Sequence, residues 1–293
     1  MKIAKYQYKS KEYIGIMQPE KLLCLPDLAK NYETDLPITM EDFIENTKAE
    51  EIASRLIEKM TCSELDAFSV SISKVKLLTP IASPPKILCL GLNYASHVEE
   101  TKEKKPDQPV VFMKPNTTII GPDDAIIKRS FVEQLDYEAE LAIVIGRQAK
   151  DIPISEASKY VFGYTILNDV SARDFQFKGS QWTPGKSFDT FAPIGPCITT
   201  NKQLSNIDNL KIKTWVNEEL RQDGNTRDMI FNISEIVSFL SRIMTLKPCD
   251  IIATGTPSGV GMAMRPQKWL NKGDKVKIEI EGIGILENTV EER

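Results

Sequence analysis

The sequence predicts a strand-rich α+β protein that carries a small α/β module at its N-terminus. After residue 86 the chain is divided into short apolar runs separated by Gly, Pro, Asn and Asp, a pattern typical of strands. The preceding segment, Leu78–Lys86, is rich in proline, which ends helices and central strands because it lacks the amide donor. We therefore expect an N-terminal module over residues 1–80 and a main body over residues 85–293.

The N-terminal module contains patterns for two strands and one helix. Lys2–Tyr8 and Tyr13–Met17 are short alternating segments that predict a pair of strands. Met40–Met60 consists of helix-forming residues with apolar side chains at helical spacing. We expect one helix there, with a buried stripe formed by Phe43, Ile44, Ile52, Leu56, Ile57 and Met60.

The main body is predicted to consist mostly of strands, interrupted by one clear helix. The predicted strands are Ile87–Gly91, Val110–Met113, Leu141–Ile145, Val161–Asn168, Ile251–Thr254 and Lys275–Ile280. Asn232 and Glu235 have the spacing of a capping box, and the apolar side chains after them fall on one helical face. These residues predict a helix that begins at Asn232.

Composition excludes several classes of protein. With 37 basic and 41 acidic side chains, a net charge of -4 gives no basic surface for nucleic acid. No apolar stretch is long enough to span a membrane, and the N-terminus lacks an apolar leader segment. The five cysteines are scattered, which favours buried thiols in a reducing compartment over disulfides. We expect an unprocessed cytoplasmic protein with no membrane or nucleic-acid partner.

The sequence contains a single histidine, His97, and this restricts the metal chemistry. Zinc proteases, iron sites with two histidines and zinc fingers of the Cys2His2 type all need more than one imidazole. Any metal site must therefore use oxygen ligands or cysteine.

Two glutamates precede a buried-looking strand. Residues two apart in a strand point the same way, so Glu138 and Glu140 are expected to share a face and to be able to hold one cation. A solvated strand face is the alternative, because alternating charges are common on exposed sheets. The continuation Leu141–Ile145 is apolar on both faces, however, and carboxylates beside a buried strand need partners.

A second acidic cluster, Asn168–Gln176, follows the next predicted strand. Its alternative interpretation is a turn with a helix N-cap at Asp169 or Ser171. Together, Glu138, Glu140 and Asp169 would make an all-oxygen site suited to Mg²⁺ or Mn²⁺, with Ca²⁺ also possible.

The single histidine lies just after the predicted strand Ile87–Gly91. On a helical turn, His97 and Glu100 would be neighbours, and a carboxylate there can orient an imidazole. Glu99 would serve as the partner equally well, and a surface histidine beside unrelated glutamates is the alternative.

Two loops add weaker signals. Gly185-Lys186-Ser187 resembles the end of a phosphate-binding loop, but Ser180 stands where that motif needs glycine, so we expect no nucleotide site. Thr254–Gly261 follows a predicted strand and, like the first loop, is also explained by ordinary turn chemistry.

Taken in order, these segments resemble the fumarylacetoacetate hydrolase family, and in particular its domain-containing homologues. The similarity extends over roughly residues 85–290 and rests on Gly91–Tyr94 with His97 and Glu100, Phe112–Pro115, Asp136–Leu141, Asn168–Asp174 with Gln176, Gly185–Phe188 and Thr254–Pro257. The resemblance implies a mixed β-sandwich or rolled β-barrel with a central metal site, and a homodimer.

The resemblance also implies roles for individual residues. It assigns Glu138, Glu140 and Asp169 to the metal, and His97 with Glu100 to the general base. It assigns Lys186, Arg173 and Gln176 to substrate oxygens, and we count Lys186 as catalytic. It assigns Thr256 to the substrate carboxylate, and we count Lys114 with the substrate-binding residues. The His97 segment is expected to be a lid.

The implied substrate is a small 2-oxo acid. We predict a divalent-metal-dependent hydrolase that cleaves a carbon–carbon bond in a 2,4-dioxo acid, as an acylpyruvase does, through a metal-chelated enolate. The alternatives on the same site are oxaloacetate decarboxylation or tautomerisation and the hydration or isomerisation of 2-oxo-enoic diacids. A catalytically silent binding homologue is a further alternative, because a fold does not guarantee activity.

Overall fold

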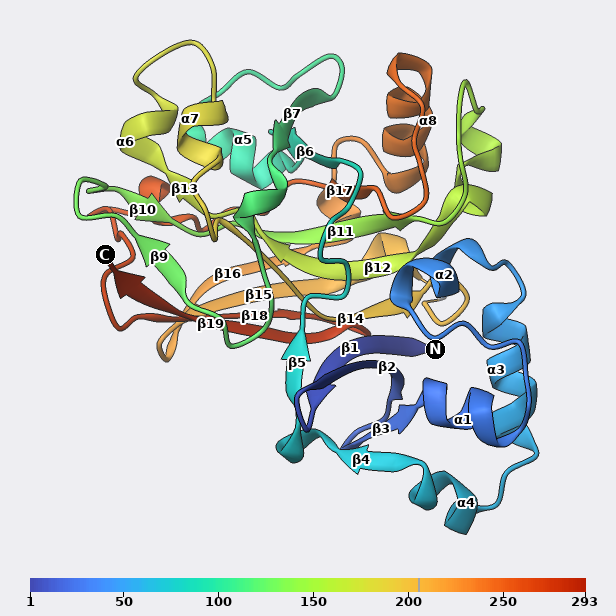
Figure 1. Cartoon of the computed structure of the whole chain (residues 1–293). Coiled ribbons are helices and arrows are strands. Elements are labelled where there is room, and N and C mark those ends of the chain that lie inside the picture. Colours follow the sequence, from blue (N-terminus) through green and yellow to red (C-terminus); the bar gives the residue numbers. More distant parts are fainter. Residues whose placement is uncertain (205) are drawn as a thin grey trace.

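The protein is built on two β-sheets that pack against each other, with short helices around them (Figure 1). The computed structural model describes residues 1–204 and 206–293. The larger sheet has the order β4-β3-β2-β1-β14-β12-β11-β17-β6-β7, and the smaller sheet has the order β16-β15-β18-β19-β9. Parallel and antiparallel pairs occur together, which agrees with the predicted strand-rich α+β class.

The bounds of the elements are as follows. The larger sheet contains β1 (Lys2–Tyr8), β2 (Lys11–Met17), β3 (Lys21–Cys24), β4 (Ser69–Ser71), β6 (Ile87–Gly91), β7 (Val110–Lys114), β11 (Ala139–Ile145), β12 (Val161–Asn168), β14 (Ala192–Thr200) and β17 (Ile251–Ala253), with β5 (Lys76–Leu78) beside β1 and β8 (Ile119–Ile120) beside β14. The smaller sheet contains β9 (Ile126–Lys128), β15 (Lys211–Val216), β16 (Glu219–Asn225), β18 (Lys275–Ile280) and β19 (Gly284–Glu292), and β10 (Leu135–Asp136) pairs with β13 (Ser171–Ala172). The helices are α1 (Leu25–Asn31), α2 (Met40–Glu45), α3 (Ala49–Glu58), α4 (Cys62–Ala67), α5 (Ala95–Thr101), α6 (Arg173–Gln176), α7 (Thr183–Lys186) and α8 (Ile233–Ile243).

Strand β11 separates two hydrophobic cores. Successive side chains of a strand point to opposite faces, so Leu141 and Ile143 pack in the core shared with the smaller sheet. Ala142 and Val144 point the other way, into a core that includes residues of α1 and α2. A strand buried on both faces is apolar throughout, which explains the continuous apolar run seen in the sequence.

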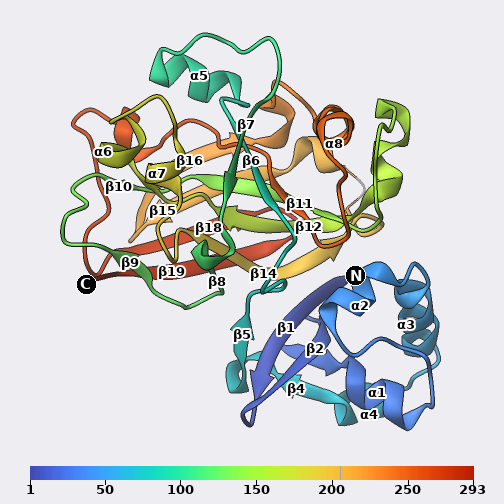
Figure 2. The same cartoon turned by 45° about the horizontal axis from the view of Figure 1, so that its top comes forward.

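The N-terminal module is joined to the body through the larger sheet. The predicted strand pair is confirmed as β1 and β2, and β1 continues the sheet by pairing with β14 of the body. Helices α1 to α4 lie together at this end of the molecule (Figure 2). The division of the chain between residues 80 and 85 stays a prediction.

The single helix predicted over Met40–Met60 is wrong, because the chain forms two helices there. α2 ends at Glu45, and α3 begins at Ala49. Between them the side chain of Asn46 accepts a hydrogen bond of 2.9 Å from the backbone N–H of Lys48. Such local bonding by asparagine competes with helix formation and ends the helix here. The apolar residues nevertheless keep a helical spacing on both sides of this break.

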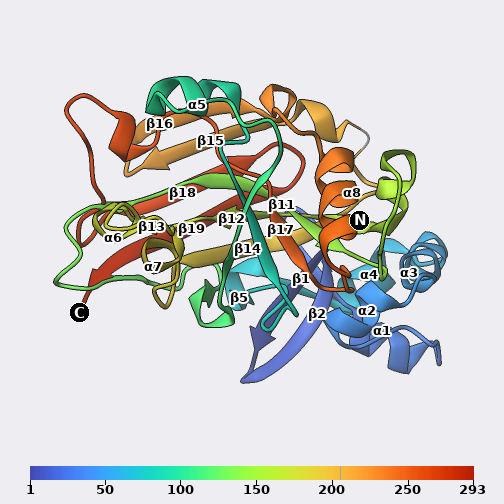
Figure 3. The same ribbon diagram turned by 90° about the horizontal axis from the view of Figure 1, so that it is seen from above.

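The helix predicted after Asn232 is confirmed. The Asn232 side chain accepts from the N–H of Glu235, and the Glu235 side chain accepts from the N–H of Asn232. α8 lies away from α5, α6 and α7, which gather around the other end of the central strands (Figure 3). Within the described part of the chain, every helix is too short or too polar to cross a membrane.

Candidate active site

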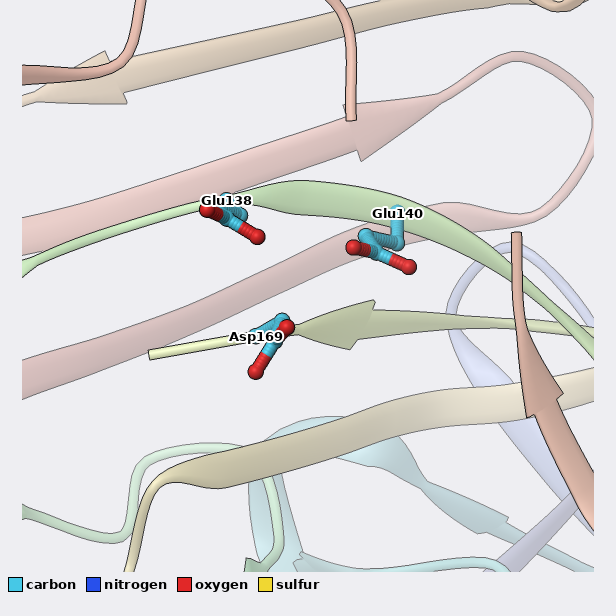
Figure 4. Close-up of side chains that lie close together, drawn as sticks. All are labelled: Glu138, Glu140 and Asp169. Atoms are coloured by element: carbon cyan, nitrogen blue, oxygen red, sulfur yellow. The ribbon is translucent and has the colours of Figure 1, made fainter. Parts of the chain in front are cut away.

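Three buried carboxylates meet where β11 begins and β12 ends. The backbone N–H of Asp169 donates to the carbonyl of Glu138 over 2.9 Å, and this antiparallel pairing sets Asp169 opposite Glu138. Glu138 and Glu140 share a side because they are two residues apart, as the sequence predicts (Figure 4). Carboxylate oxygens of the three residues lie within 4.8 Å of one another. The helix that follows, α6, has Ala172 as its N-cap and no side-chain cap, so the expected alternative of an N-cap at Asp169 or Ser171 is wrong.

Positive side chains neutralise part of this acidic cluster. Lys186 Nζ lies 2.9 Å from Glu138 and 2.6 Å from Asp169, and Arg173 Nη1 lies 2.7 Å from Glu138. All of these groups are buried. Ion pairs in a low dielectric are strong, and loss of one partner leaves an uncompensated charge, so the cluster must hold together as a unit.

The surroundings shift the pKa values of the two glutamates in opposite directions. Burial alone raises the pKa of Glu138, but Lys186 and Arg173 outweigh it and hold that pKa below its usual range. Burial and the neighbouring charges of Asp169 and Glu138 raise the pKa of Glu140 well above its usual value. Burial lowers the pKa of Lys186, yet Asp169 and Glu138 reverse this effect and raise it, so Lys186 stays charged.

The donor set fits a hard divalent cation. Mg²⁺ and Mn²⁺ take carboxylate oxygens, and the triad of Glu138, Glu140 and Asp169 offers three from one buried spot. Lys186 pairs with Glu138 and Asp169, whereas burial and the charges of these two acids raise the pKa of Glu140. A divalent cation would supply positive charge and stabilise Glu140 in its ionised form.

The single histidine forms a pair with Glu100 on α5. His97 Nδ1 lies 2.8 Å from Glu100 Oε1, while Glu99 is exposed, so Glu100 is the partner. The second oxygen of Glu100 accepts a hydrogen bond of 2.8 Å from the N–H of Gly259. Glu100 is therefore held from two directions. A carboxylate at Nδ1 leaves Nε2 as the nitrogen available to a ligand.

The turn after β17 is tied to the triad. The N–H of Gly255 donates to Glu140 Oε2 over 2.7 Å, and Gly255 has a positive φ of 94°. A Cβ atom at this position would lie 2.9 Å from Asn93 Cβ. Glycine therefore allows the backbone both to turn and to approach Glu140, which brings the next residue, Thr256, to the site.

Lys186 is positioned by the close packing of α6 and α7. A Cβ atom on Gly185 would lie 2.5 Å from the N of Gln176 and 2.6 Å from the O of Ala172. Only glycine permits this approach, which sets Lys186 beside Arg173 and Gln176. Arg173 Nη1 also donates to Gln176 Oε1 over 2.9 Å.

A cavity of about 280 Å³ opens at one member of the triad, Glu138. Most of the predicted site residues line it, namely His97, Glu138, Arg173, Gln176, Lys186 and Thr256. Lys114 lies behind Asp169, to which its Nζ donates, and also donates to the carbonyl of Val170. Its assignment to the substrate stays a prediction. Phe112 forms an apolar part of the wall together with Phe177 and Trp182, two residues that the sequence analysis did not single out.

Comparison with known proteins identifies the family. The family description "Fumarylacetoacetate (FAA) hydrolase C-terminal" matches residues 86–291. The chain belongs to the fumarylacetoacetate hydrolase family. The oxaloacetate tautomerase YisK of Bacillus subtilis is 42% identical over 99% of this chain and 100% of its own length. A fumarylacetoacetate hydrolase domain-containing protein 2 homolog of Dictyostelium discoideum is 47% identical, over 75% of this chain and 76% of its own.

A solved structure supports the same relationship. Maleylpyruvate hydrolase from Sphingobium sp. SYK-6, in complex with manganese(II) ion and pyruvate, matches with a TM-score of 0.80 and 28% identity, over 100% of this chain and 99% of that one. The predicted fold of the fumarylacetoacetate hydrolase family is therefore confirmed, and this chain is an enzyme-family member with a buried acidic triad that can bind a metal.

Asp136 is a residue to which the sequence analysis assigned no role in this member of the fumarylacetoacetate hydrolase family. It is 0% exposed, and within the described part of the chain the donors to its two oxygens are all N–H groups. Arg173 Nε donates to Oδ2 over 2.9 Å, and the N–H groups of Gly261 and Met262 donate over 2.8 and 3.1 Å. Asp136 thus connects Arg173 to the turn at Gly261 and Met262 through hydrogen bonds. Its position two residues before Glu138 was the available signal.

We predict that Asp136→Asn lowers the free energy of unfolding by about 3 kcal/mol, as expected for breaking a buried ion pair. The new amide must direct its NH₂ group against one of the N–H groups that Asp136 now accepts from. Urea denaturation measures the change. The exposed Glu219→Gln variant is the matched control and should keep the wild-type stability. A wild-type unfolding curve for Asp136→Asn would contradict this account of Arg173.

Proposed function

We propose that this protein is a divalent-metal-dependent enzyme that interconverts the keto and enol forms of oxaloacetate. The observation that carries the proposal is the cavity that His97, Arg173 and Lys186 line together with Glu138, a member of the acidic triad. The 42% identity to an oxaloacetate tautomerase, over nearly the whole of both chains, supports this substrate. The proposed cofactor is Mg²⁺ or Mn²⁺, with Ca²⁺ as a further candidate.

The wall of the cavity suits an anionic 2-oxo acid. Bound at Glu138, Glu140 and Asp169, the cation would polarise the keto group of the substrate and stabilise negative charge on its oxygen. Arg173 and Lys186 bring positive charge to the same space, which attracts the carboxylates of oxaloacetate.

His97 is the proposed base. Glu100 holds Nδ1 and so directs Nε2 toward the ligand, where it would take a proton from the carbon next to the keto group. Overall one C–H bond breaks and one O–H bond forms, so tautomerisation consumes no co-substrate. Lys186, which the neighbouring carboxylates keep charged, would stabilise the oxygen on which negative charge develops.

Hydrolysis of a 2,4-dioxo acid is the second candidate function, and one specific observation favours it. The same His97 and Glu100 pair can activate a water instead of taking a proton from carbon, and a maleylpyruvate hydrolase has a similar structure. Decarboxylation, hydration and isomerisation use the same enolate chemistry and remain alternatives. Tautomerisation takes first place because the oxaloacetate tautomerase is 42% identical to this chain, whereas the maleylpyruvate hydrolase is 28% identical.

We also propose that the enzyme is a homodimer in the cytoplasm. The exposed side chains Phe131 and Phe177 offer apolar surface beside α6 that a second copy would cover. The cytoplasmic location rests on the scattered cysteines, which favour a reducing compartment.

We predict that the purified protein with Mg²⁺ accelerates the loss of enol oxaloacetate, followed by the ultraviolet absorbance of the conjugated enol. Acylpyruvates should be cleaved much more slowly, and coupling to lactate dehydrogenase should detect little pyruvate from oxaloacetate. Protein treated with a chelator is the control. Rapid cleavage of acylpyruvates with no effect on enol oxaloacetate would contradict the tautomerase proposal and support the hydrolase function.

We predict that His97→Ala lowers kcat by about 10²- to 10⁴-fold, the usual contribution of a general base, while Mg²⁺ still binds. The loss should be clean because the chain has no second histidine. The control is Glu99→Ala, which removes an exposed carboxylate on the same helix and should keep full activity. Unchanged turnover by His97→Ala would exclude the role of His97.

A further inference from the structure

A buried glutamine connects the triad strand to the loop that carries Thr256. Gln222 belongs to β16 in the smaller sheet and is 0% exposed. Its side chain reaches both the N–H of Ala139, which lies between Glu138 and Glu140, and the segment Thr256-Pro257. A buried polar side chain with partners on separate elements fixes their relative positions.

The orientation of the Gln222 amide follows from its backbone partners. The N–H of Ala139 can only donate, so the atom 3.1 Å from it is the oxygen Oε1. The carbonyl of Pro257 can only accept, so the atom 2.9 Å from it is the nitrogen Nε2. The Thr214 hydroxyl donates to Oε1 over 2.8 Å. Turning the amide over would break these bonds.

This orientation fixes the direction of the Thr256 hydroxyl. Gln222 Nε2 lies 2.8 Å from Thr256 Oγ1 and is a donor, so Oγ1 accepts that hydrogen bond. A hydroxyl has one proton, and the proton of Thr256 is then left for a partner in the cavity that Thr256 lines.

We infer that Gln222 is a positioning residue that makes Thr256 a hydrogen-bond donor toward the substrate, and that this pair selects a ligand oxygen that only accepts, such as a carboxylate. The inference rests on the proposed function for the identity of the substrate. It adds a determinant of specificity that lies outside the cavity wall, on the second sheet.

Gln222→Glu tests the inference with a side chain of the same shape. The new oxygen only accepts when the group is ionised and has one proton when it is neutral. In neither form can it donate to both Thr256 Oγ1 and the Pro257 carbonyl. The Thr256 proton is then drawn away from the cavity or left without a fixed direction. We expect KM for oxaloacetate to rise by about 10-fold or more, as for loss of a hydrogen bond to a charged group, with kcat changed much less.

A double-mutant cycle separates this role from a merely structural one. Thr256→Val removes the hydroxyl, and in that background Gln222→Glu should cause no further rise in KM. Thr214→Val, which removes the other hydroxyl bonded to Gln222, is the matched control and should keep KM near the wild-type value. An unchanged KM in Gln222→Glu, or an equal rise in the Thr256→Val background, would overturn the inference.

Oxalate separates failure of this inference from failure of the proposed function. Oxalate presents carboxylate oxygens and needs no turnover, so its affinity in the presence of Mg²⁺ can be measured by calorimetry for every variant. If the wild type did not convert oxaloacetate, the proposed function would fail, and the same cycle on oxalate affinity would still decide the role of Gln222. An affinity that Thr256→Val leaves unchanged would overturn the inference.

Discussion

The burial of four carboxylates in one place is the constraint on which the rest of the site depends. Asp136, Glu138, Glu140 and Asp169 lie almost out of contact with water, and ionised groups there need positive partners. The chain supplies Arg173, Lys186 and Lys114, which pair with three of the four acids. Glu140 has no such partner among them, and burial together with the charges of Asp169 and Glu138 raises its pKa.

The scaffold brings these charges together from distant parts of the chain. The pairing of β11 with β12 sets the triad, the contact of α6 with α7 at Gly185 brings Lys186, and the turn at Gly255 adds Thr256. The two cores on either face of β11 hold the triad strand in place. The site is therefore rigid where charge is concentrated, which suits electrostatic stabilisation of a developing enolate.

Local patterns predicted the features that depend on neighbours in sequence. The shared side of Glu138 and Glu140 follows from the strand period, and the capping box before α8 and the pairing of His97 on one helical turn follow from helical spacing. Features that depend on residues distant in sequence could not be predicted from these patterns. The choice of Glu100 over Glu99 involves the N–H of Gly259, and the roles of Asp136 and Gln222 arise only from three-dimensional packing. The helix break at Asn46 is local, but apolar spacing does not report it.

Calorimetric titration with Mn²⁺ and Mg²⁺ tests the central claim most directly, because it measures whether the triad holds a cation. We expect one cation per chain. We expect Glu140→Gln to weaken metal binding by at least about 10-fold, because removing even a residue that only hydrogen-bonds to a metal ligand costs about this much affinity. Glu99→Gln should bind as the wild type does. The account would be contradicted if millimolar metal gave no binding, or if Glu140→Gln bound the metal as tightly as the wild type.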